Sequence, residues 1–100
     1  MKYPLAFSTW GVEETDAIQK VVDSDMYTMG KHVKQFENEF AELFKSPNAV
    51  MVNSGSSANL LMLSLLKWKY KLKGDIIAPV VGWATTYFPI VQNGFTINFV

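Results

Sequence analysis

The order of structural elements can be read outward from residues 49–60, AVMVNSGSSANL. A short apolar run of strand length, 49–52, is followed by the small polar residues NSGSS. The next residues, 57–72, are apolar on almost every face, which predicts a buried helix. Several lysines near its end, followed by Gly74, suit a helix C-terminus with glycine at C′. The stretch therefore predicts a strand that passes through a donor-rich bend into a helix.

The sequence after this helix repeats the alternation. Residues 75–80 and 95–100 are apolar runs of strand length, and 84–92 between them predicts a short helix that Pro89 could kink. Strand, helix, strand, helix and strand over 46–100 predict a parallel sheet with right-handed crossovers. We therefore expect an α/β fold in which the carboxyl ends of the strands meet at one edge of the sheet.

The first part of the chain, residues 1–45, is expected to be a helical N-terminal arm. Apolar residues recur at helical spacing over 12–24 and again over 31–44, with a loop around Gly30 between them. A chain of 100 residues can supply at most one small domain.

Composition excludes several classes of function. The formal net charge of zero predicts no nucleic-acid partner, since phosphate backbones are bound by clustered Lys and Arg. No cysteine is present, which excludes disulfides, thiol catalysis and cysteine-ligated metals. A single histidine gives little support for a zinc site, so we expect no metal. No apolar run has the length of a signal peptide or a membrane span, so we expect a cytoplasmic protein without membrane contact.

The bend at 53–57 has the composition of a phosphate-binding site. It begins a helix, where the first N–H groups lack internal partners and the helix dipole is positive. Ser54, Ser56 and Ser57 add hydroxyl donors, and Gly55 is expected to let the chain turn without a Cβ clash. The alternative is purely structural, with a serine as N-cap and the glycine as a turn residue. Neither the dinucleotide-binding fingerprint nor the P-loop pattern occurs in the sequence.

A tryptophan follows the next predicted strand. Trp83 lies in PVVGWATT, 79–86, which should emerge at the same edge of the sheet as the serine-rich bend. A large flat ring beside a phosphate site suggests stacking on a flat cofactor ring. The alternative is that Trp83 packs beneath the following helix, as many tryptophans do.

Three blocks of sequence resemble the DegT/DnrJ/StrS family of nucleotide-sugar enzymes. They are YTMGKHVKQFENEFAELF at 27–44, AVMVNSGSSANLLML at 49–63 and GDIIAPVVGWATTYFPIVQNGF at 74–95, followed by the INFV strand. Within the family, YTMGKHVKQFE and WATTYFP are most similar to the 4-keto-6-deoxyhexose 3-dehydratases. The resemblance implies that residues 1–100 are the N-terminal segment of the large domain of a fold-type-I, aspartate aminotransferase-like enzyme.

The resemblance also implies a cofactor, pyridoxal 5′-phosphate or pyridoxamine 5′-phosphate. Ser54, Gly55 and Ser56, with Ser57 beside them, match the family's phosphate-binding loop. Trp83 matches the aromatic residue that stacks on the pyridine ring. The implied partners are a nucleotide-linked 4-keto-6-deoxy sugar, an amino donor such as glutamate, and a second copy of the subunit in a homodimer.

No residue of this chain is assigned to catalysis. The family's cofactor-binding lysine, or the histidine that replaces it in the dehydratases, lies further along those enzymes. None of the nine lysines here falls at the carboxyl end of a predicted strand, and His32 opens a helix, where it is expected to be solvated. Thr28, Met29 and Gly30 match a loop that lies near active sites in the family, or they form a simple turn between helices.

Three classes of function stay open. The resemblance favours a 3-dehydratase of lipopolysaccharide or other surface-polysaccharide biosynthesis, and a pyridoxal phosphate-dependent aminotransferase would share every feature named. A flavodoxin-like module could hold a flavin phosphate on the serine-rich bend. A non-catalytic interaction segment is the third alternative.

Overall fold

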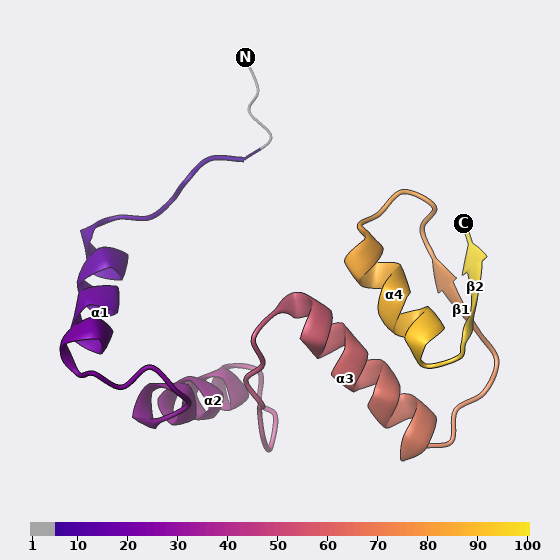
Figure 1. The fold of residues 1–100 in the computed structure, drawn as a ribbon. Helices are drawn as coiled ribbons and strands as arrows, with labels where there is room; N and C mark the ends of the chain where they lie inside the picture. Colours follow the sequence, from indigo (N-terminus) through magenta and orange to yellow (C-terminus); the bar gives the residue numbers. More distant parts are fainter. Residues whose placement is uncertain (1–5) are drawn as a thin grey trace. The chain divides into compact units, whose positions relative to one another are not determined.

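The computed structural model describes residues 6–100, and the chain divides into two compact units, Met1–Ala49 and Val50–Val100. Figure 1 shows helices in the first unit, and helices together with strands in the second. Residues 1–5 of the expected helical arm lie outside the described residues. None of the helices within 6–100 is both long and apolar enough to cross a membrane.

The first unit contains α1, Val12–Asp23, and α2, Lys31–Leu43, so both predicted helices are confirmed to within one residue at each end. Helix α1 begins where the Gly11 N–H donates to the Glu14 carboxylate at 2.7 Å. This contact and the Glu14 backbone N–H lower the pKa of the Glu14 carboxyl. Of the residues described in these helices, only Ala41 is buried.

Helix α2 carries an aromatic stripe at helical spacing. The rings of Phe36 and Phe40 have centroids 5.5 Å apart, and those of Phe40 and Phe44 4.5 Å apart. All three rings stay substantially exposed in this structure. The three rings therefore contact one another at a spacing of four residues along one face.

The second unit contains α3, Gly55–Trp68, then β1, Asp75–Ala78, α4, Ala84–Gln92, and β2, Thr96–Phe99. The two strands pair in parallel, with Asp75 opposite Thr96 and Ala78 opposite Phe99. Parallel strands need a crossover connection, and α4 supplies it. The predicted α/β organisation is confirmed from β1 onward.

The strand expected over 49–52 is absent from the described residues, which form a two-stranded sheet of β1 and β2. A strand requires a neighbour that accepts and donates its backbone hydrogen bonds. Residues 49–52 are apolar enough for a strand, but they pair with neither β1 nor β2. The apolar composition of 49–52 predicted a strand, but composition does not indicate whether a neighbouring strand is available to pair with it.

The core of the second unit is small. Ala78, Ile90 and Phe95 are buried together, one each from β1, α4 and the turn before β2. Partly buried side chains surround them: Leu63, Ile76, Tyr87 and Ile97. Helix α3 has no buried residue, so the prediction of a buried helix is wrong for this structure. Its apolar residues do occur on every face, but among the described elements only α4 packs against it closely.

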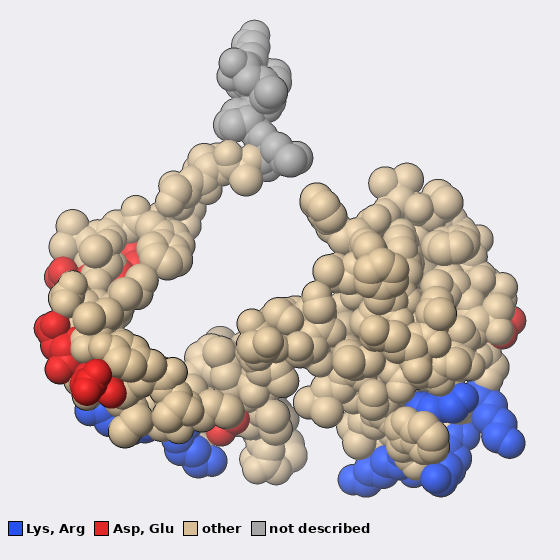
Figure 2. Space-filling view, in the orientation of Figure 1, with Lys and Arg blue, Asp and Glu red and all other residues tan. Residues whose placement is uncertain are grey.

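The end of α3 also differs from the sequence expectation. The helix ends at Trp68, and Lys71 adopts the left-handed conformation with φ of 56°. Gly74 has φ of 114° but lies six residues past the helix, just before β1, so it is not the C′ residue. Figure 2 shows lysine side chains gathered over this end of the second unit; they belong to Lys67, Lys69, Lys71 and Lys73.

Candidate functional site

The serine loop, residues 53–57, forms the N-terminus of α3. Ser54 is the N-cap in an extended conformation, and its Oγ accepts the Ser57 N–H at 3.2 Å. The first helical hydrogen bond follows, from the Ala58 N–H to the Ser54 carbonyl at 3.0 Å. Ser54 therefore has the capping role that the structural alternative assigned to it, and the loop leads straight into a regular helix.

A chain of side-chain hydrogen bonds stiffens this loop. The Ser54 hydroxyl donates to Ser57 Oγ at 3.2 Å, and the Ser57 hydroxyl donates to Asn53 Oδ1 at 2.6 Å. Sequence reasoning did not single out Asn53, although its position four residues before Ser57 places it at the base of the helix. The hydroxyls of Ser54 and Ser57 shape the loop, while Ser56 lies at the second helical position and is exposed.

Gly55 occupies the first helical position. A Cβ built there meets no atom within 4 Å, and the residue does not have a positive φ. The expectation that glycine is needed for a clash-free turn is therefore wrong. The glycine instead leaves open space before the helix, where the N–H groups of Gly55 and Ser56 have no partner within the helix.

Trp83 lies at the end of the connection from β1 to α4. It is the N-cap residue of α4 and its side chain is 81% exposed. The alternative of a tryptophan packed beneath the following helix does not hold in this structure. The backbone fixes the residue, since the Trp83 carbonyl accepts the Thr86 N–H at 2.9 Å.

Helices α3 and α4 are joined at two points that fix their register. Asn59 Nδ2 donates to the Thr85 carbonyl at 3.4 Å, and the Ser64 hydroxyl donates to Asn93 Oδ1 at 3.0 Å. Both helices thus run in the same direction and begin at the same end of the unit. The first of these contacts joins α3, two residues past the serine loop, to the first turn of α4.

Pro89 explains why Asn59 makes this contact. A residue at position 89 would donate its N–H to the Thr85 carbonyl in a regular helix, but proline has no N–H. Asn59 provides a side-chain donor for that carbonyl instead. The predicted helix over 84–92 therefore forms despite its proline, and its first turn is attached to α3.

A hollow of about 210 Å³ lies between the first half of α3 and the length of α4. It is lined by Ser56, Ser57, Leu60, Thr85, Phe88, Pro89 and Gln92. No charged residue occurs in the sequence at 46–66 or at 76–100, which includes all of this lining. An anion at this end would be held by N–H groups, hydroxyls and helix dipoles rather than by ion pairs.

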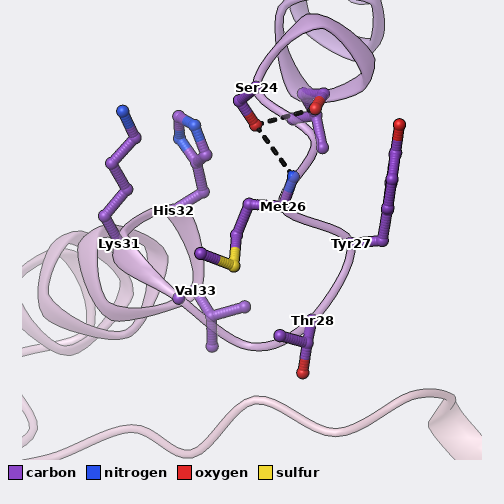
Figure 3. A pocket seen from close by; sticks show the side chains of 9 residues that line it. Ser24, Met26, Tyr27, Thr28, Lys31, His32 and Val33 are labelled. Carbon is purple, nitrogen blue, oxygen red and sulfur yellow. Dashed lines mark hydrogen bonds between the residues drawn. The ribbon is translucent and has the colours of Figure 1, made fainter.

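A second hollow, of about 570 Å³, belongs to the first unit. Figure 3 shows its lining around the turn between α1 and α2, where Ser24 Oγ donates to the Val21 carbonyl and accepts the Met26 N–H. Thr28, Gly30 and His32 all line this hollow, and His32 is exposed, as expected for a solvated histidine. Within residues 6–100 no three acidic or histidine side chains gather closely enough to hold a metal ion.

Comparison with known proteins gives one consistent family. Residues 9–100 match the DegT/DnrJ/EryC1/StrS aminotransferase family. The whole chain is 51% identical to the GDP-4-keto-6-deoxy-D-mannose 3-dehydratase of Yersinia pseudotuberculosis and covers 26% of it.

Two solved structures are similar over 98% of this chain, each with a TM-score of 0.82. One is E. coli GDP-4-keto-6-deoxy-D-mannose-3-dehydratase with bound hydrated PLP, at 55% identity. The other is a GDP-4-keto-6-deoxymannose-3-dehydratase with a trapped PLP-glutamate geminal diamine, at 56% identity. The chain spans about a quarter of the length of these relatives.

Proposed function

This chain belongs to the DegT/DnrJ/EryC1/StrS aminotransferase family, and from that premise we propose that it binds pyridoxal 5′-phosphate or pyridoxamine 5′-phosphate. The phosphate would lie at the start of α3, against Ser54, Gly55, Ser56 and Ser57. The indole of Trp83 would stack on the pyridine ring. The observation that carries the proposal is the likeness, at TM-score 0.82 and 55% identity, to a dehydratase that holds PLP.

The residues of the serine loop fit a phosphate group. The N–H groups of Gly55 and Ser56 have no partner within the helix, and a Cβ built at position 55 meets no atom within 4 Å. The positive end of the α3 dipole favours an anion there. Ser56 is exposed at the second helical position, and its hydroxyl adds a donor. Because no charged side chain competes nearby in the sequence, the phosphate would be recognised by directed hydrogen bonds.

The intact enzyme would be a 3-dehydratase of a nucleotide-linked 4-keto-6-deoxy sugar, serving lipopolysaccharide or related polysaccharide biosynthesis. When bound, the cofactor would supply an amino group for the keto carbon of the sugar and an electron-withdrawing ring that makes a proton on the cofactor's own exocyclic carbon easier to remove. The residues of this chain would hold the cofactor phosphate and one face of its ring. The proton-handling group, a histidine in the family's dehydratases, would come from another part of the enzyme.

The test is to supply the intact enzyme with pyridoxal phosphate, glutamate and a GDP-linked 4-keto-6-deoxy sugar. We expect a product that has lost the C3 hydroxyl, with glutamate as the reductant, oxidised to 2-oxoglutarate and releasing ammonia. We also expect no lysine adduct after borohydride treatment. An amino sugar together with a trapped lysyl adduct would identify an aminotransferase. An FMN absorbance band without either product would favour the flavodoxin-like alternative.

The remaining expectations concern organisation and place in the cell. We propose that residues 1–45 form a helical arm and 46–100 begin the large domain. The Thr28–Gly30 turn would lie near the active site. A homodimer, which the family resemblance implies, and a cytoplasmic location, expected from the apolar pattern of the sequence, are tested by sedimentation and cell fractionation of the intact enzyme.

A further inference from the structure

The segment that carries Trp83, residues 79–83, has few side-chain contacts of its own. The Trp83 ring is 81% exposed, so its direction depends on how firmly the backbone beneath it is held. One anchor is a sheet-like hydrogen bond from the Val80 N–H to the Val100 carbonyl at 2.9 Å. The second anchor is a side chain, the hydroxyl of Tyr87, which donates to the Pro79 carbonyl at 2.8 Å.

The Tyr87 ring is held in place by contacts with the core and with β2. It lies in the first half of α4 and packs against the buried cluster of Ala78, Ile90 and Phe95. Its ring also meets the Phe99 ring edge to face, with centroids 5.4 Å apart and planes at 79°. The ring is therefore held by the core and by β2, while its hydroxyl reaches back to the start of the loop.

Gly82 leaves room for this contact. A Cβ at position 82 would lie 2.5 Å from the Tyr87 hydroxyl oxygen and 3.2 Å from the ring carbon that bears it. The backbone conformation of Gly82 does not itself demand glycine, because its φ is not positive. The glycine is needed for the close approach, and any side chain there would push the Tyr87 hydroxyl away from Pro79.

We propose that Tyr87 is a positioning residue, which holds the 79–83 segment so that the Trp83 indole is presented to the cofactor ring. This inference rests on the proposed function, because it assigns to Trp83 the stacking role given above. Tyr87 would act through Trp83 and touch neither cofactor nor substrate. The Pro79 carbonyl accepts the hydrogen bond from Tyr87, and Gly82 lacks the side chain that would collide with the Tyr87 hydroxyl.

The test begins with Tyr87→Phe in the intact enzyme, which removes the hydroxyl and keeps the ring. We expect faster deuterium exchange of the amides at 80–84 in the cofactor-free protein. We also expect pyridoxal phosphate affinity about two- to fivefold weaker, within the range for one lost hydrogen bond and no larger than the loss expected when the Trp83 ring itself is removed. Tyr70→Phe, beyond the opposite end of α3, is the matched control and should change neither measurement.

Two combined variants separate positioning from general stability. In a Trp83→Ala background, Tyr87→Phe should weaken the affinity no further, because the group it positions is gone. Gly82→Ala should mimic Tyr87→Phe, and the two together should be no worse than either alone. An unchanged exchange rate at 80–84 in Tyr87→Phe, or additive losses with Trp83→Ala, would overturn the proposal. If the wild-type enzyme binds no pyridoxal phosphate, the proposed function fails, while the exchange measurement still decides the role of Tyr87.

Discussion

The two units of the chain have similar lengths and very different internal organisation. In the first unit, α1 and α2 are amphipathic, and the described contacts are mostly between residues within four positions of each other. In the second, β1, α4 and β2 meet at a buried cluster and α3 is bonded to α4 across 26 and 29 residues of sequence. The second unit is also the one that holds the serine loop and Trp83.

The two units also differ in net charge. The first unit has five lysines and eight acidic residues, a net charge of −3, and the second has four lysines and one acidic residue, a net charge of +3. The charges of the second unit all lie at 67–75, away from the serine loop. Helical periodicity is therefore sufficient to form α1 and α2. The serine loop and Trp83, in contrast, belong to elements joined by contacts between residues far apart in the sequence.

The largest expected effect concerns the isolated 100-residue chain. Since its core comprises three buried residues in the second unit and α3 has none, we expect no cooperative thermal transition and no tight binding of pyridoxal phosphate. Hydrogen exchange should still distinguish the units, with protected amides in β1, α4 and β2 and near-unprotected amides in α1. A sharp melting transition with strong near-ultraviolet circular dichroism would contradict the expectation that the isolated chain lacks a cooperative fold.

The next effect comes from the buried cluster. In the intact enzyme, Ile90→Ala should lower the free energy of unfolding by about 2–5 kcal/mol, because Ile90 is 3% exposed and its removal leaves a cavity. Phe40→Ala in α2 is the contrasting variant, since Phe40 is 43% exposed. Denaturant unfolding measures both. An equal loss for Phe40→Ala would mean that the α2 stripe is buried in the intact enzyme.

A smaller effect is expected at Trp83. Trp83→Ala in the intact enzyme should weaken cofactor binding by about 1 kcal/mol, and Trp83→Phe should restore most of it, because a phenyl ring can still stack. Equilibrium dialysis against pyridoxal phosphate measures the change. Loss of thermal stability in both variants with unchanged affinity would show that Trp83 belongs to packing and not to the site.

The smallest effect belongs to the start of α1. The hydrogen bonds that hold the pKa of Glu14 below its ordinary value stabilise the helix start while the carboxyl is ionised. That contribution is present above the unfolded-state pKa and is lost as pH falls through the lower pKa of the folded state. The NMR shift of the Gly11 amide should follow this titration. In Glu14→Gln, which stays neutral, the titration should vanish.

Sequence alone predicted the helices and the order of β1, α4 and β2, because these depend on local periodicity. The bounds of α4 were predicted to the residue, although Pro89 argued against a helix there. The compensating donor, Asn59, comes from another helix, and no local pattern could indicate it. The prediction of a strand at 49–52 was wrong for a related reason. A strand forms only beside a partner strand, and a local pattern does not show whether that partner is present.

In the candidate site too, the sequence indicated residues with recognisable local chemistry but not those whose roles depend on distant partners. The serines and Trp83 were found because hydroxyls at a helix start and a ring after a strand have recognisable chemistry. Asn53 and Tyr87 were missed, since their roles depend on which atoms they reach: Ser57 Oγ in one case, the Pro79 carbonyl in the other. Gly55 was assigned a turn role that its backbone does not need, because sequence cannot distinguish space for a turn from space for a ligand.

The proline within α4 has a consequence for how this chain acquires its structure as it is synthesised. The Thr85 carbonyl, which lacks a donor at position 89, accepts from Asn59 of α3, so α4 gains this hydrogen bond only when it packs on α3. Because α3 precedes α4 in the chain, it has left the ribosome first and can serve as the template. We therefore expect α4 to pack on α3 once both have been synthesised, and β2, which follows them in the chain, to pair with β1 last.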